Sequence, residues 1–524
     1  MPNLGIVLGL LVAIVILAGL AARLRISYPI LLVVGGLALG FVPGLPAIQL
    51  SPELVFLIFL PPLLYAESFS SSYREFSANL GPIVLLAVGL VVVTMFSVGM
   101  VAHLVIPGLA LSAALVLGAI VGPTDEVAVA PLIERIGLPR RLIVVLEAES
   151  LLNDGVSLVL FNVAVTAVVA GSFSLLGASL QLLTSALGGA LIGLIAGWLI
   201  LQVRRVVPGP APLGATISLL SGYAAYLPAQ ALHLSGVLAV VAFGLYASAE
   251  LPRFTPADVR LEIEETWNVV TFLLNSVLFI LVGLQLHDIL TDLSSTTPLT
   301  LLVYGIIVSA IVMVARIAWV FAVTYVPWLA SMLLRGPTPP PDWKPVAVVS
   351  SVGIRGAISL AAALSVPITT ASGGPFPDRD LIIYLTFAVI FATMILQGST
   401  LPALVHALGL REAAPLREQE MQVRLELTRA ALDRLASLAE NEEVPADVLE
   451  DVRSHLEKQF RRYTTAGQKG LEVKKELVTR KKQLLRDVLK EQRETLLAMR
   501  AEGRVPDDLG RQIQRDLDLQ EVRL

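Results

Sequence analysis

Long apolar stretches, separated by short polar connections, fill the chain from its first residues to about residue 410. A bilayer core about 30 Å thick is crossed by a helix of roughly 20 mostly apolar residues. The pattern therefore predicts an all-α polytopic membrane protein with about thirteen transmembrane helices. The predicted spans are residues 3–22, 28–47, 51–69, 80–106, 109–134, 141–170, 173–203, 213–228, 235–249, 265–287, 299–326, 343–368 and 380–408.

After residue 410 the pattern changes, and charged residues alternate with Leu, Ala and Val at helical spacing. Residues 1–410 contain 15 Lys/Arg and 19 Asp/Glu, about 8% of that part, whereas residues 411–524 contain 23 of each, about 40%. A chain that is 55% hydrophobic overall is not an ordinary soluble enzyme. We expect a transmembrane domain at 1–410 and a charged helical tail at 411–524, either a solvated helical bundle or a regulatory or dimer-supporting module.

The basic residues of the short loops fall almost entirely on one side of the predicted membrane. If the N-terminus lies outside, twelve of them lie in inner loops and one, Arg379, lies in an outer loop. Because Lys and Arg accumulate on the cytoplasmic side, we expect an outside N-terminus and a cytoplasmic tail in the plasma membrane. The inner residues are Arg23, Arg25, Arg74, Arg135, Arg140, Arg141, Arg204, Arg205, Arg253, Arg260, Arg335 and Lys344.

The fifth predicted span carries a helix break beside a carboxylate, in the segment GPTDEVAVAP. Gly122 and Pro123 disfavour a continuous helix, and non-helical backbone at membrane depth is tolerated where it lines a cavity or is packed in protein. Thr124 and Asp125 follow directly. Asp125 would also suit the start of a second half-helix. Discontinuous helices form cation sites in transporters, so we expect this break to contribute to one.

The sixth predicted span holds three carboxylates in LEAESLLNDGVSLVLF. Each costs at least roughly 2.5–3.5 kcal/mol at the centre of a membrane helix, so such residues are usually functional or paired. Asp154 and Ser150 are four residues apart and share one helix face, as do Glu149 and Asn153 on the adjacent face. Small hard cations prefer oxygen ligands, and Asp154, Ser150 and Thr124 supply them.

The twelfth predicted span contains one charged residue after its first turn, Arg355 in SSVGIRGAISLAAAL. A lone Arg and a lone Glu are each costly in lipid, so we expect Glu149 and Arg355 to form a structural ion pair. The small residues around Arg355 favour close helix crossing or a second helix break, which would mark an inverted-repeat binding site together with the fifth span. The sequence leaves four charged residues without a role: Glu147, Glu126, Glu67 and Arg316.

Three motifs resemble those of a known transporter family. ESLLNDG (149–155) is close to the sixth-helix signature of the cation:proton antiporter 1 family, which contains the NhaP antiporters and the animal sodium/proton exchangers. GPTDEVAVAP resembles the unwound fifth helix of that family, and GIRGAISLA (353–361) resembles its Arg-bearing twelfth helix. The resemblance covers residues 1–410. Glu126 departs from it, because many members have Pro at that position.

The resemblance implies an inverted-repeat antiporter fold with broken helices 5 and 12. Spans 4–6 and 11–13 would form a core that carries the ion, and spans 1–3 and 7–10 would form the dimer domain of a homodimer. The implied ion- and proton-binding residues are Asp154, Asp125, Thr124, Ser150 and Asn153, of which the first four would hold Na⁺ and Asn153 would pack beside Asp154. No cofactor is expected besides the transported ions, and no nucleic-acid partner.

One buried carboxylate can hold either a proton or a cation, and neutralising it lowers the cost of moving it through a low-dielectric path. If only the loaded forms cross, exchange is obligatory. Asn153 cannot titrate, and family members with Asn-Asp here are associated with electroneutral exchange. We therefore predict an electroneutral 1:1 antiporter of a monovalent cation, Na⁺ or also Li⁺, and H⁺, which would serve pH regulation.

Other functions fit the sequence less well or differ in the ion. The ligand types do not distinguish Na⁺ from K⁺, so a K⁺/H⁺ antiporter with the same mechanism is the alternative. A cation channel would need a continuous pore, against which the buried carboxylate and the helix break argue. A transporter-like sensor would have lost the chemistry of Asp154, which is present. No nucleophile–base motif or phosphate loop indicates an enzyme.

Overall fold

The computed structural model describes residues 2–24, 28–42, 52–78, 80–125, 140–170, 175–207, 209–293, 296–335, 339–370, 373–410, 415–441 and 446–466, and scattered positions after 482. Regular structure in these ranges is helical, apart from an isolated bridge between Thr369 and Pro375. The chain forms two compact units, Met1–Glu412 and Ala413–Leu524. The first unit contains the apolar stretches and the second contains the charged tail.

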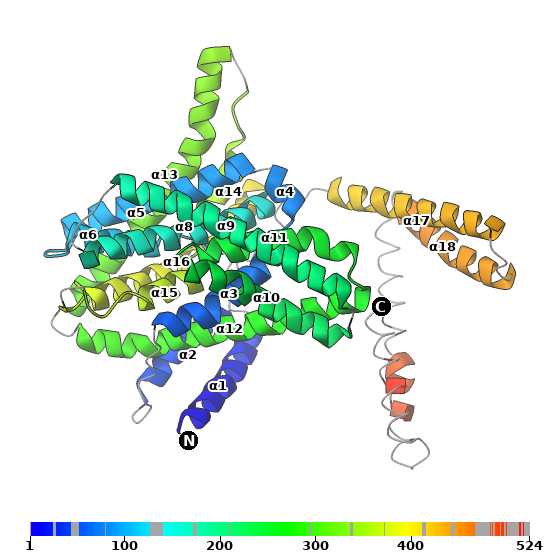
Figure 1. Ribbon diagram of the computed structural model, residues 1–524, viewed down its shortest axis with the longest axis horizontal. Helices are drawn as coiled ribbons and strands as arrows, with labels where there is room; N and C mark the ends of the chain where they lie inside the picture. Colours follow the sequence, from blue (N-terminus) through cyan, green and yellow to red (C-terminus); the bar gives the residue numbers. More distant parts are fainter. Residues whose placement is uncertain are drawn as a thin grey trace. The chain divides into compact units, whose positions relative to one another are not determined.

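Each of the thirteen stretches expected to cross the membrane contains helix in the first unit (Figure 1). By length and composition, six helices of the described residues can cross a membrane: α5, α8, α9, α12, α13 and α16. The helices are α1 (Pro2–Leu24), α2 (Tyr28–Gly40), α3 (Pro52–Ser70), α4 (Tyr73–Ala78), α5 (Leu80–Val105), α6 (Leu111–Ile120), α8 (Arg140–Ala170), α9 (Leu175–Val206), α10 (Ala211–Ala231), α11 (Gly236–Glu250), the short 3₁₀ helix η1 (Leu251–Arg253), α12 (Ala257–Asp292), α13 (Pro298–Arg335), α14 (Trp343–Ser351), α15 (Ala357–Leu364) and α16 (Arg379–Leu408).

Helix contacts divide the first unit into two groups. The core group consists of α5, α6, α8, α13, α14, α15 and α16, and the scaffold group consists of α1, α2, α3, α9, α10, α11 and α12. The core group contains the helices of predicted spans 4–6 and 11–13. The scaffold group contains the helices of predicted spans 1–3 and 7–10. The two groups meet chiefly where α15 contacts α3 and α12, where α16 contacts α12, and where α8 contacts α9 and α11.

Glycines allow the backbones of the scaffold helices to touch. A Cβ atom at Gly36 on α2 would overlap the carbonyl oxygen of Ile280 on α12, and one at Gly283 would overlap the carbonyl oxygen of Val33. Gly189 and Gly193 of α9 meet the carbonyls of Ser235 and Ala239 in the same way. Such small-residue contacts are a common way for membrane helices to pack closely, and they join α2 to α12 and α9 to α11.

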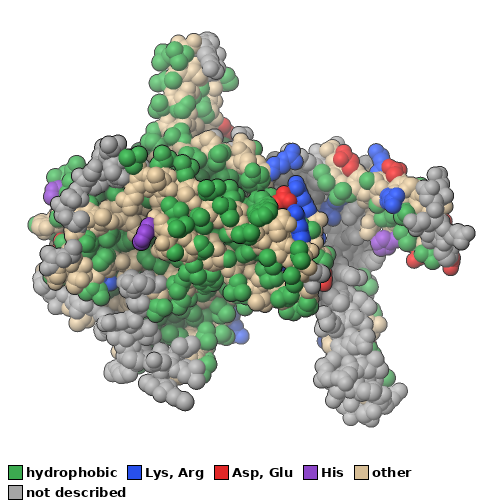
Figure 2. Space-filling model, viewed as in Figure 1, with side chains coloured by type: hydrophobic (Ala, Val, Ile, Leu, Met, Phe, Trp, Pro, Cys, Tyr) green, Lys and Arg blue, Asp and Glu red, His purple; other side chains and the backbone are tan. Residues whose placement is uncertain are grey.

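The surface of the first unit is rich in large apolar side chains. Figure 2 shows hydrophobic side chains over much of its visible face, with few charged ones among them. On α9 the exposed side chains recur every three or four residues at Leu183, Leu187, Leu191 and Leu194. A stripe of this kind suits contact with lipid or another apolar partner.

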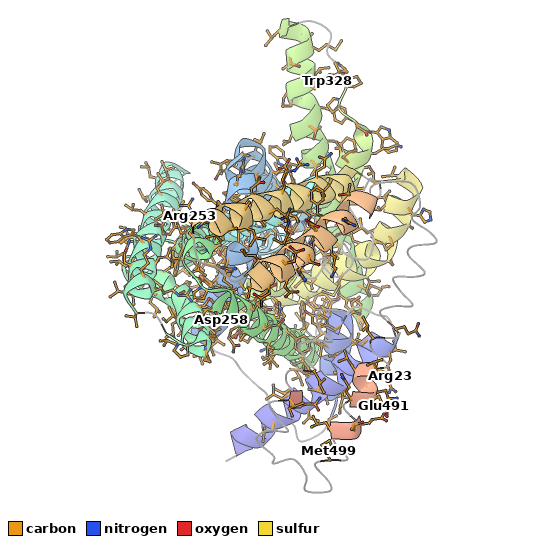
Figure 3. The ribbon with its side chains drawn as sticks, turned by 90° about the vertical axis from the view of Figure 1, so that its right-hand side faces the viewer. Arg23, Arg253, Asp258, Trp328, Glu491 and Met499 are labelled. Atoms are coloured by element: carbon orange, nitrogen blue, oxygen red, sulfur yellow. The ribbon has the colours of Figure 1, made fainter. Side chains whose placement is uncertain are left out.

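Helix α13 has 38 residues and is therefore about 57 Å long at 1.5 Å per residue. Its last turns extend past the neighbouring helices, in the part where Trp328 is labelled (Figure 3). Tyr325 stacks on Phe321 and donates to the carbonyl of Pro341 at 3.2 Å, which holds the returning segment against the helix. The middle of α13 packs against α5, α14 and α16, and this part carries Arg316 into the core group.

The second unit contains two described helices, α17 (Pro415–Asn441) and α18 (Ala446–Ala466), which pack against each other. Both helices belong to the predicted charged helical tail at 411–524, and most of the tail after residue 466 lies outside the described residues. The Arg429 guanidinium lies 5.8 Å from the ring centre of Phe460 and joins the two helices.

Candidate cation-binding site

Helix α6 ends in the middle of the first unit, at the Gly-Pro pair seen in the sequence. Ile120 is its last residue, and the backbone from Gly122 to Asp125 is non-helical. Val121 through Thr124 are buried, and Asp125 is half-buried. The rest of the fifth predicted span, Glu126 included, lies outside the described residues. The last carbonyls of α6 therefore need donors from other elements, because a helix end leaves them without helical partners.

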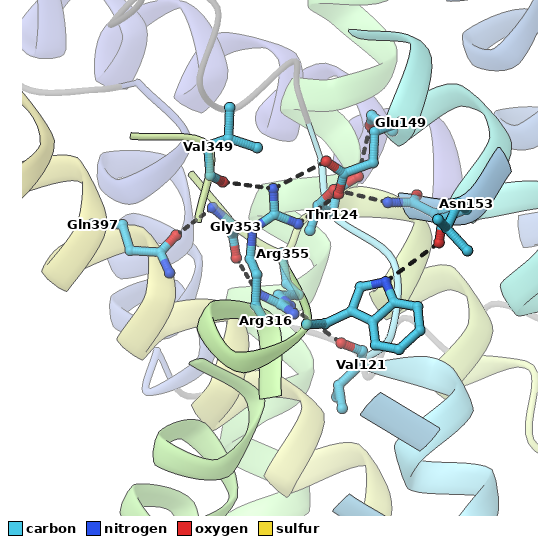
Figure 4. Close-up of polar contacts among 12 residues, drawn as sticks. Val121, Thr124, Glu149, Asn153, Arg316, Val349, Gly353, Arg355 and Gln397 are labelled. Carbon is cyan, nitrogen blue, oxygen red and sulfur yellow. Dashed lines mark hydrogen bonds and ion pairs between the residues drawn. The ribbon is translucent and has the colours of Figure 1, made fainter. Parts of the chain in front are cut away.

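The polar face of α8 supplies those donors (Figure 4). Ser157 Oγ donates to the carbonyl of Ala119 at 2.7 Å, and Ser150 Oγ donates to the carbonyl of Thr124 at 2.6 Å. Asn153 Nδ2 donates to Thr124 Oγ1 at 2.8 Å. The helical spacing of these side chains thus fits them to the last turn of α6 and to the non-helical backbone after it, and it brings three of the predicted site residues together.

Asp154 lies on the same helix, one turn beyond Ser150. Its side chain is buried, with 3% of the residue exposed. Ser150 and Asn153, which precede Asp154 by four residues and by one on this helix, both hydrogen-bond to Thr124, and Asn153 is fully buried. The carboxylate, hydroxyl and carbonyl oxygens that the sequence singled out thus lie in one buried region.

A second interruption lies in the twelfth predicted span. α14 ends at Ser351 and α15 begins at Ala357, and the five residues between them are buried and non-helical. Side chains of α16 hold this segment: Gln397 Oε1 accepts from Gly353 N at 2.8 Å, and Thr393 Oγ1 accepts from Arg355 N at 3.2 Å. The Asp125 amide donates to the carbonyl of Ile354 at 2.8 Å and joins the two non-helical segments.

The partner of Glu149 is Arg316 on α13, so the prediction of a Glu149–Arg355 pair is wrong. Arg316 Nη1 and Nη2 donate to the two carboxylate oxygens at 2.6 and 3.2 Å, and Nη2 also donates to the carbonyl of Val349 at 3.1 Å. Both side chains are almost completely buried. A bidentate pair of charged hydrogen bonds of this kind is stronger than a single neutral one. These contacts connect α8 to α13 and α14 (Figure 4).

The backbone around each arginine explains the correction. Arg316 lies inside the unbroken α13, where helical bonding occupies the carbonyls, so its guanidinium needs other acceptors. Arg355 lies in the interruption and uses carbonyls directly: Nε donates to Val121 O at 3.1 Å, and Nη1 donates to Gly353 O. Val121 caps the end of α6, where the helix dipole favours a cation. Of the two arginines, Arg355 is the one flanked by glycines, Gly353 and Gly356.

Glu67 on α3 is one of the four charged residues that the sequence left without a role. Its carboxylate is within electrostatic range of Asp154 and Asp125, although it belongs to the scaffold group. It also lines a cavity of about 580 Å³ between α3 and α12. A second cavity, of about 560 Å³, begins one turn beyond Asp154 on α8, at Leu158. The sequence pointed to Glu67 only as a single acidic residue near the end of the apolar span at 51–69.

Comparison with known proteins supports these observations. The model of the transmembrane sodium/hydrogen exchanger family matches residues 9–407. An uncharacterized Na⁺/H⁺ exchanger of Mycobacterium tuberculosis is 37% identical, and the match covers 100% of this chain and 96% of the relative. The sodium, potassium, lithium and rubidium/H⁺ antiporter of Bacillus pumilus is 33% identical over 82% of this chain and 66% of the relative.

The fold is also that of a solved antiporter. The sodium proton antiporter MjNhaP1 of Methanocaldococcus jannaschii superposes with a TM-score of 0.61 at 23% identity, over 78% of this chain and 99% of that one. The family match runs through both interrupted segments, through α8 and through α13. The chain therefore belongs to the sodium/hydrogen exchanger family, a family of transporters.

Proposed function

We propose that Asp154 is the carboxylate that alternately holds Na⁺ and a proton in this monovalent cation/proton antiporter. The observation that carries the proposal is the burial of Asp154 beside the oxygen atoms at the end of α6. A buried carboxylate needs a compensating positive charge, and either a proton or a cation supplies it. The two ions therefore compete for one site, which is the chemical basis of exchange.

The neighbouring oxygens give a cation its remaining ligands. The Thr124 carbonyl accepts one hydrogen bond from Ser150 and has a second lone pair. Asn153 Oδ1 is buried, and no hydrogen-bond partner for it exists among the described residues. Asp125 lies at the junction of the two interruptions, held there through its backbone. We assign the cation to Asp154, Thr124, Ser150 and Asp125, with Asn153 positioning Thr124.

The charges around the interruptions support one-for-one exchange. Two arginines and three carboxylates are gathered there: Arg316, Arg355, Glu149, Asp125 and Asp154. With the arginines charged and the carboxylates ionised, their net charge is −1, and one bound cation or one proton makes the group neutral. Asn153 adds no titratable charge. The loaded core can therefore cross the membrane as a neutral body, whereas the empty core carries charge that low-dielectric surroundings oppose.

The arrangement of the groups supports alternating access. Every residue of the assigned site belongs to the core group, and the cavity that begins at Leu158 lies along its boundary with the scaffold group. We propose that the core moves against the scaffold, which would form the interface of a homodimer. The 12:1 distribution of basic residues supports an outside N-terminus and a cytoplasmic second unit in the plasma membrane.

K⁺ is the second candidate cation. The name of the Bacillus pumilus relative includes potassium, lithium and rubidium with sodium, whereas the relative from Aphanothece halophytica, 33% identical over 74% of this chain and 70% of the relative, is named a Na⁺/H⁺ antiporter. We propose Na⁺ as the principal ion, because the matching family and both relatives are named for sodium, whereas only one of the two names includes potassium.

Proteoliposomes test this function directly. The purified full-length protein is sealed in liposomes with a pH-sensitive dye inside, a pH gradient is imposed, and Na⁺, Li⁺ or K⁺ is added. We expect Na⁺-dependent proton flux that does not change when balanced K⁺ and valinomycin hold the membrane voltage at zero. Current without proton flux would contradict antiport, and a flux that follows voltage would contradict the 1:1 ratio. Proton flux that requires K⁺ and does not occur with Na⁺ would mean that K⁺ is the transported cation.

Gly356 offers a test of the junction at Asp125. A Cβ atom at Gly356 would overlap the Asp125 carboxyl group, so Gly356→Ala displaces that side chain. We expect the exchange rate per folded protein to fall about tenfold, since a misplaced site group of this kind costs one or two orders of magnitude. Gly398→Ala on α16, where nothing lies within 4 Å of the added atom, is the control. Equal exchange rates in both variants would mean that the position of the Asp125 side chain does not affect transport.

A further inference from the structure

The end of α13 extends beyond the other helices of the first unit as an apolar arm. The arm, residues 327–335, begins at Pro327 inside the helix and projects away from the bundle (Figure 1). The apolar sequence of α13 continues to Leu334, past the end of the predicted span at 299–326. A helix needs only roughly 20 residues to cross the hydrocarbon core of a bilayer. Crossing the membrane therefore does not account for the arm.

Large apolar side chains are exposed on several sides of the arm (Figure 2). Leu333 and Leu334 are 80% and 84% exposed, and Leu329 and Met332 are 51% and 43% exposed. Consecutive residues of a helix point about 100° apart, so Met332, Leu333 and Leu334 together face about 200° of the circumference. A helix that packs on a protein typically buries one apolar stripe, whereas lipid surrounds a helix. The distribution therefore favours lipid over a docked chain.

The composition of the arm suits an environment without water. Its sequence from Pro327 to Leu334, PWLASMLL, contains no charged residue. The hydroxyl of Ser331 donates to the carbonyl of Trp328 at 2.7 Å, so this polar group is satisfied within the helix. Polar groups in the apolar part of a bilayer need such internal partners, because lipid chains supply none.

Aromatic residues lie where the arm begins and where the chain returns from it. The rings of Tyr325 and Trp328 pack edge to face with their centres 6.1 Å apart, and the Tyr325 hydroxyl binds the returning segment at Pro341. Trp343, the first residue of α14, is 54% exposed. Tyr and Trp are enriched at the boundary between the acyl chains and the headgroups of a membrane, which places the base of the arm at that depth.

The charges of the connection from α13 to α14 complement an anionic lipid surface. Arg335 is the last residue of α13, and Lys344 is the second residue of α14. The one acidic residue between Val326 and Lys344 is Asp342, which accepts from the backbone amide of Lys344 at 3.1 Å and so caps α14. Two positive charges and one negative charge leave a net charge of +1, and basic residues next to a membrane helix attract anionic headgroups.

We infer that the arm is a membrane-surface anchor, which lies in the cytoplasmic leaflet with its leucines among the acyl chains and its connection to α14 among anionic headgroups. The exposed apolar surface of α13 continues from the predicted span, at Ile306 and Ile317, through Val326 to the arm, so one lipid phase covers both. The side of the membrane rests on the proposed orientation, whereas the insertion does not. Because α13 belongs to the core group, the anchor connects the part of the protein that carries Asp154 to the leaflet.

The chain has no cysteine, so one introduced cysteine can carry a nitroxide spin label at a chosen depth. Full-length Leu333→Cys is labelled and reconstituted in liposomes of phosphatidylcholine and phosphatidylglycerol, and spin relaxation by oxygen, which concentrates in lipid, is compared with relaxation by a water-soluble nickel chelate. Ile306→Cys, within the predicted span and 58% exposed, is the lipid control. Asp451→Cys, exposed on α18 of the charged tail, is the water control.

We expect the ratio of oxygen to nickel relaxation at Leu333→Cys to lie within about twofold of the lipid control and about tenfold above the water control, as for an inserted apolar side chain. A label that responds mainly to nickel would place the arm in water and overturn the inference. A label that neither reagent reaches would mean that protein covers the arm, and spin–spin broadening would identify a second copy; both results also overturn it. The proposed antiport is unaffected by any of these results, because no ion flux is measured.

Lipid charge tests the role of the headgroups. We expect the ratio at Leu333→Cys to be about twofold higher with phosphatidylglycerol than in phosphatidylcholine alone, because the basic residues draw the arm towards an anionic surface. Adding Arg335→Gln and Lys344→Gln should remove most of this difference, whereas Lys458→Gln, exposed on α18, should leave it unchanged. Equal ratios in the two lipid mixtures would overturn the role assigned to the headgroups.

Discussion

Replacing Asp154 with Asn is expected to abolish cation-dependent proton exchange, a loss of at least about 100-fold of the kind seen when a group essential to the reaction is removed. Asn has nearly the same shape and can still accept a hydrogen bond, so the packing of α8 is preserved. It cannot exchange a proton for a cation, because the amide does not titrate in the physiological range. The measurement is the Na⁺-dependent proton flux of the variant in proteoliposomes, normalised to inserted protein.

The matched control is Glu147→Gln. Glu147 lies two turns before Asp154 on α8, is half-buried, and lies outside the set of residues assigned to the ion. The same chemical change on the same helix should leave clear exchange activity, so the comparison separates the loss of a carboxylate in general from the loss of this one. Substantial exchange by Asp154→Asn would mean that another group carries the ions.

The second large effect concerns stability. Glu149→Gln leaves the Arg316 guanidinium buried without its carboxylate, and breaking a buried ion pair from one side typically costs about 3–5 kcal/mol. We expect a marked loss of folded, monodisperse protein and a lower Tm in detergent. Adding Arg316→Leu removes the orphaned charge, and the double variant should recover much of the loss. The measurement is the Tm and the yield of the monodisperse fraction.

The choice of partner makes this prediction specific. The double variant Glu149→Gln/Arg355→Leu should be no more stable than Glu149→Gln alone, because Arg355 donates to Val121 and Gly353 carbonyls rather than to Glu149. Rescue by Arg355→Leu and none by Arg316→Leu would reverse the assignment of the pair. Equal stability of all variants would show that neither arginine depends on this carboxylate.

Much of the fold could be predicted because lipid imposes strong rules on the sequence. Helices lie in the apolar stretches, and the interruption at Gly122 and Pro123 is where backbone chemistry requires it. Helical spacing places Ser150 and Asn153 on neighbouring faces of α8, which is a local property that a single sequence contains. Their hydrogen bonds to Thr124, 26 and 29 residues away, join separate segments and become visible only in the structure.

The pairings across the fold could not be predicted in the same way. The sequence pairs Glu149 with Arg355 and leaves Arg316 without a role, because charge alone does not choose between the two arginines. Only the three-dimensional arrangement puts Val121 O within reach of Arg355 and leaves Glu149 to Arg316.

The interruption between α14 and α15 also has a consequence for how the chain enters the membrane. With nine and eight residues, these helices are only about 14 and 12 Å long at 1.5 Å per residue, so neither crosses a bilayer alone. The non-helical amides between them are bound by Thr393 and Gln397, which the ribosome makes later. Unbonded amides are not tolerated in lipid. The twelfth span is therefore not self-sufficient in lipid, and its membrane-embedded form depends on α16 beside it.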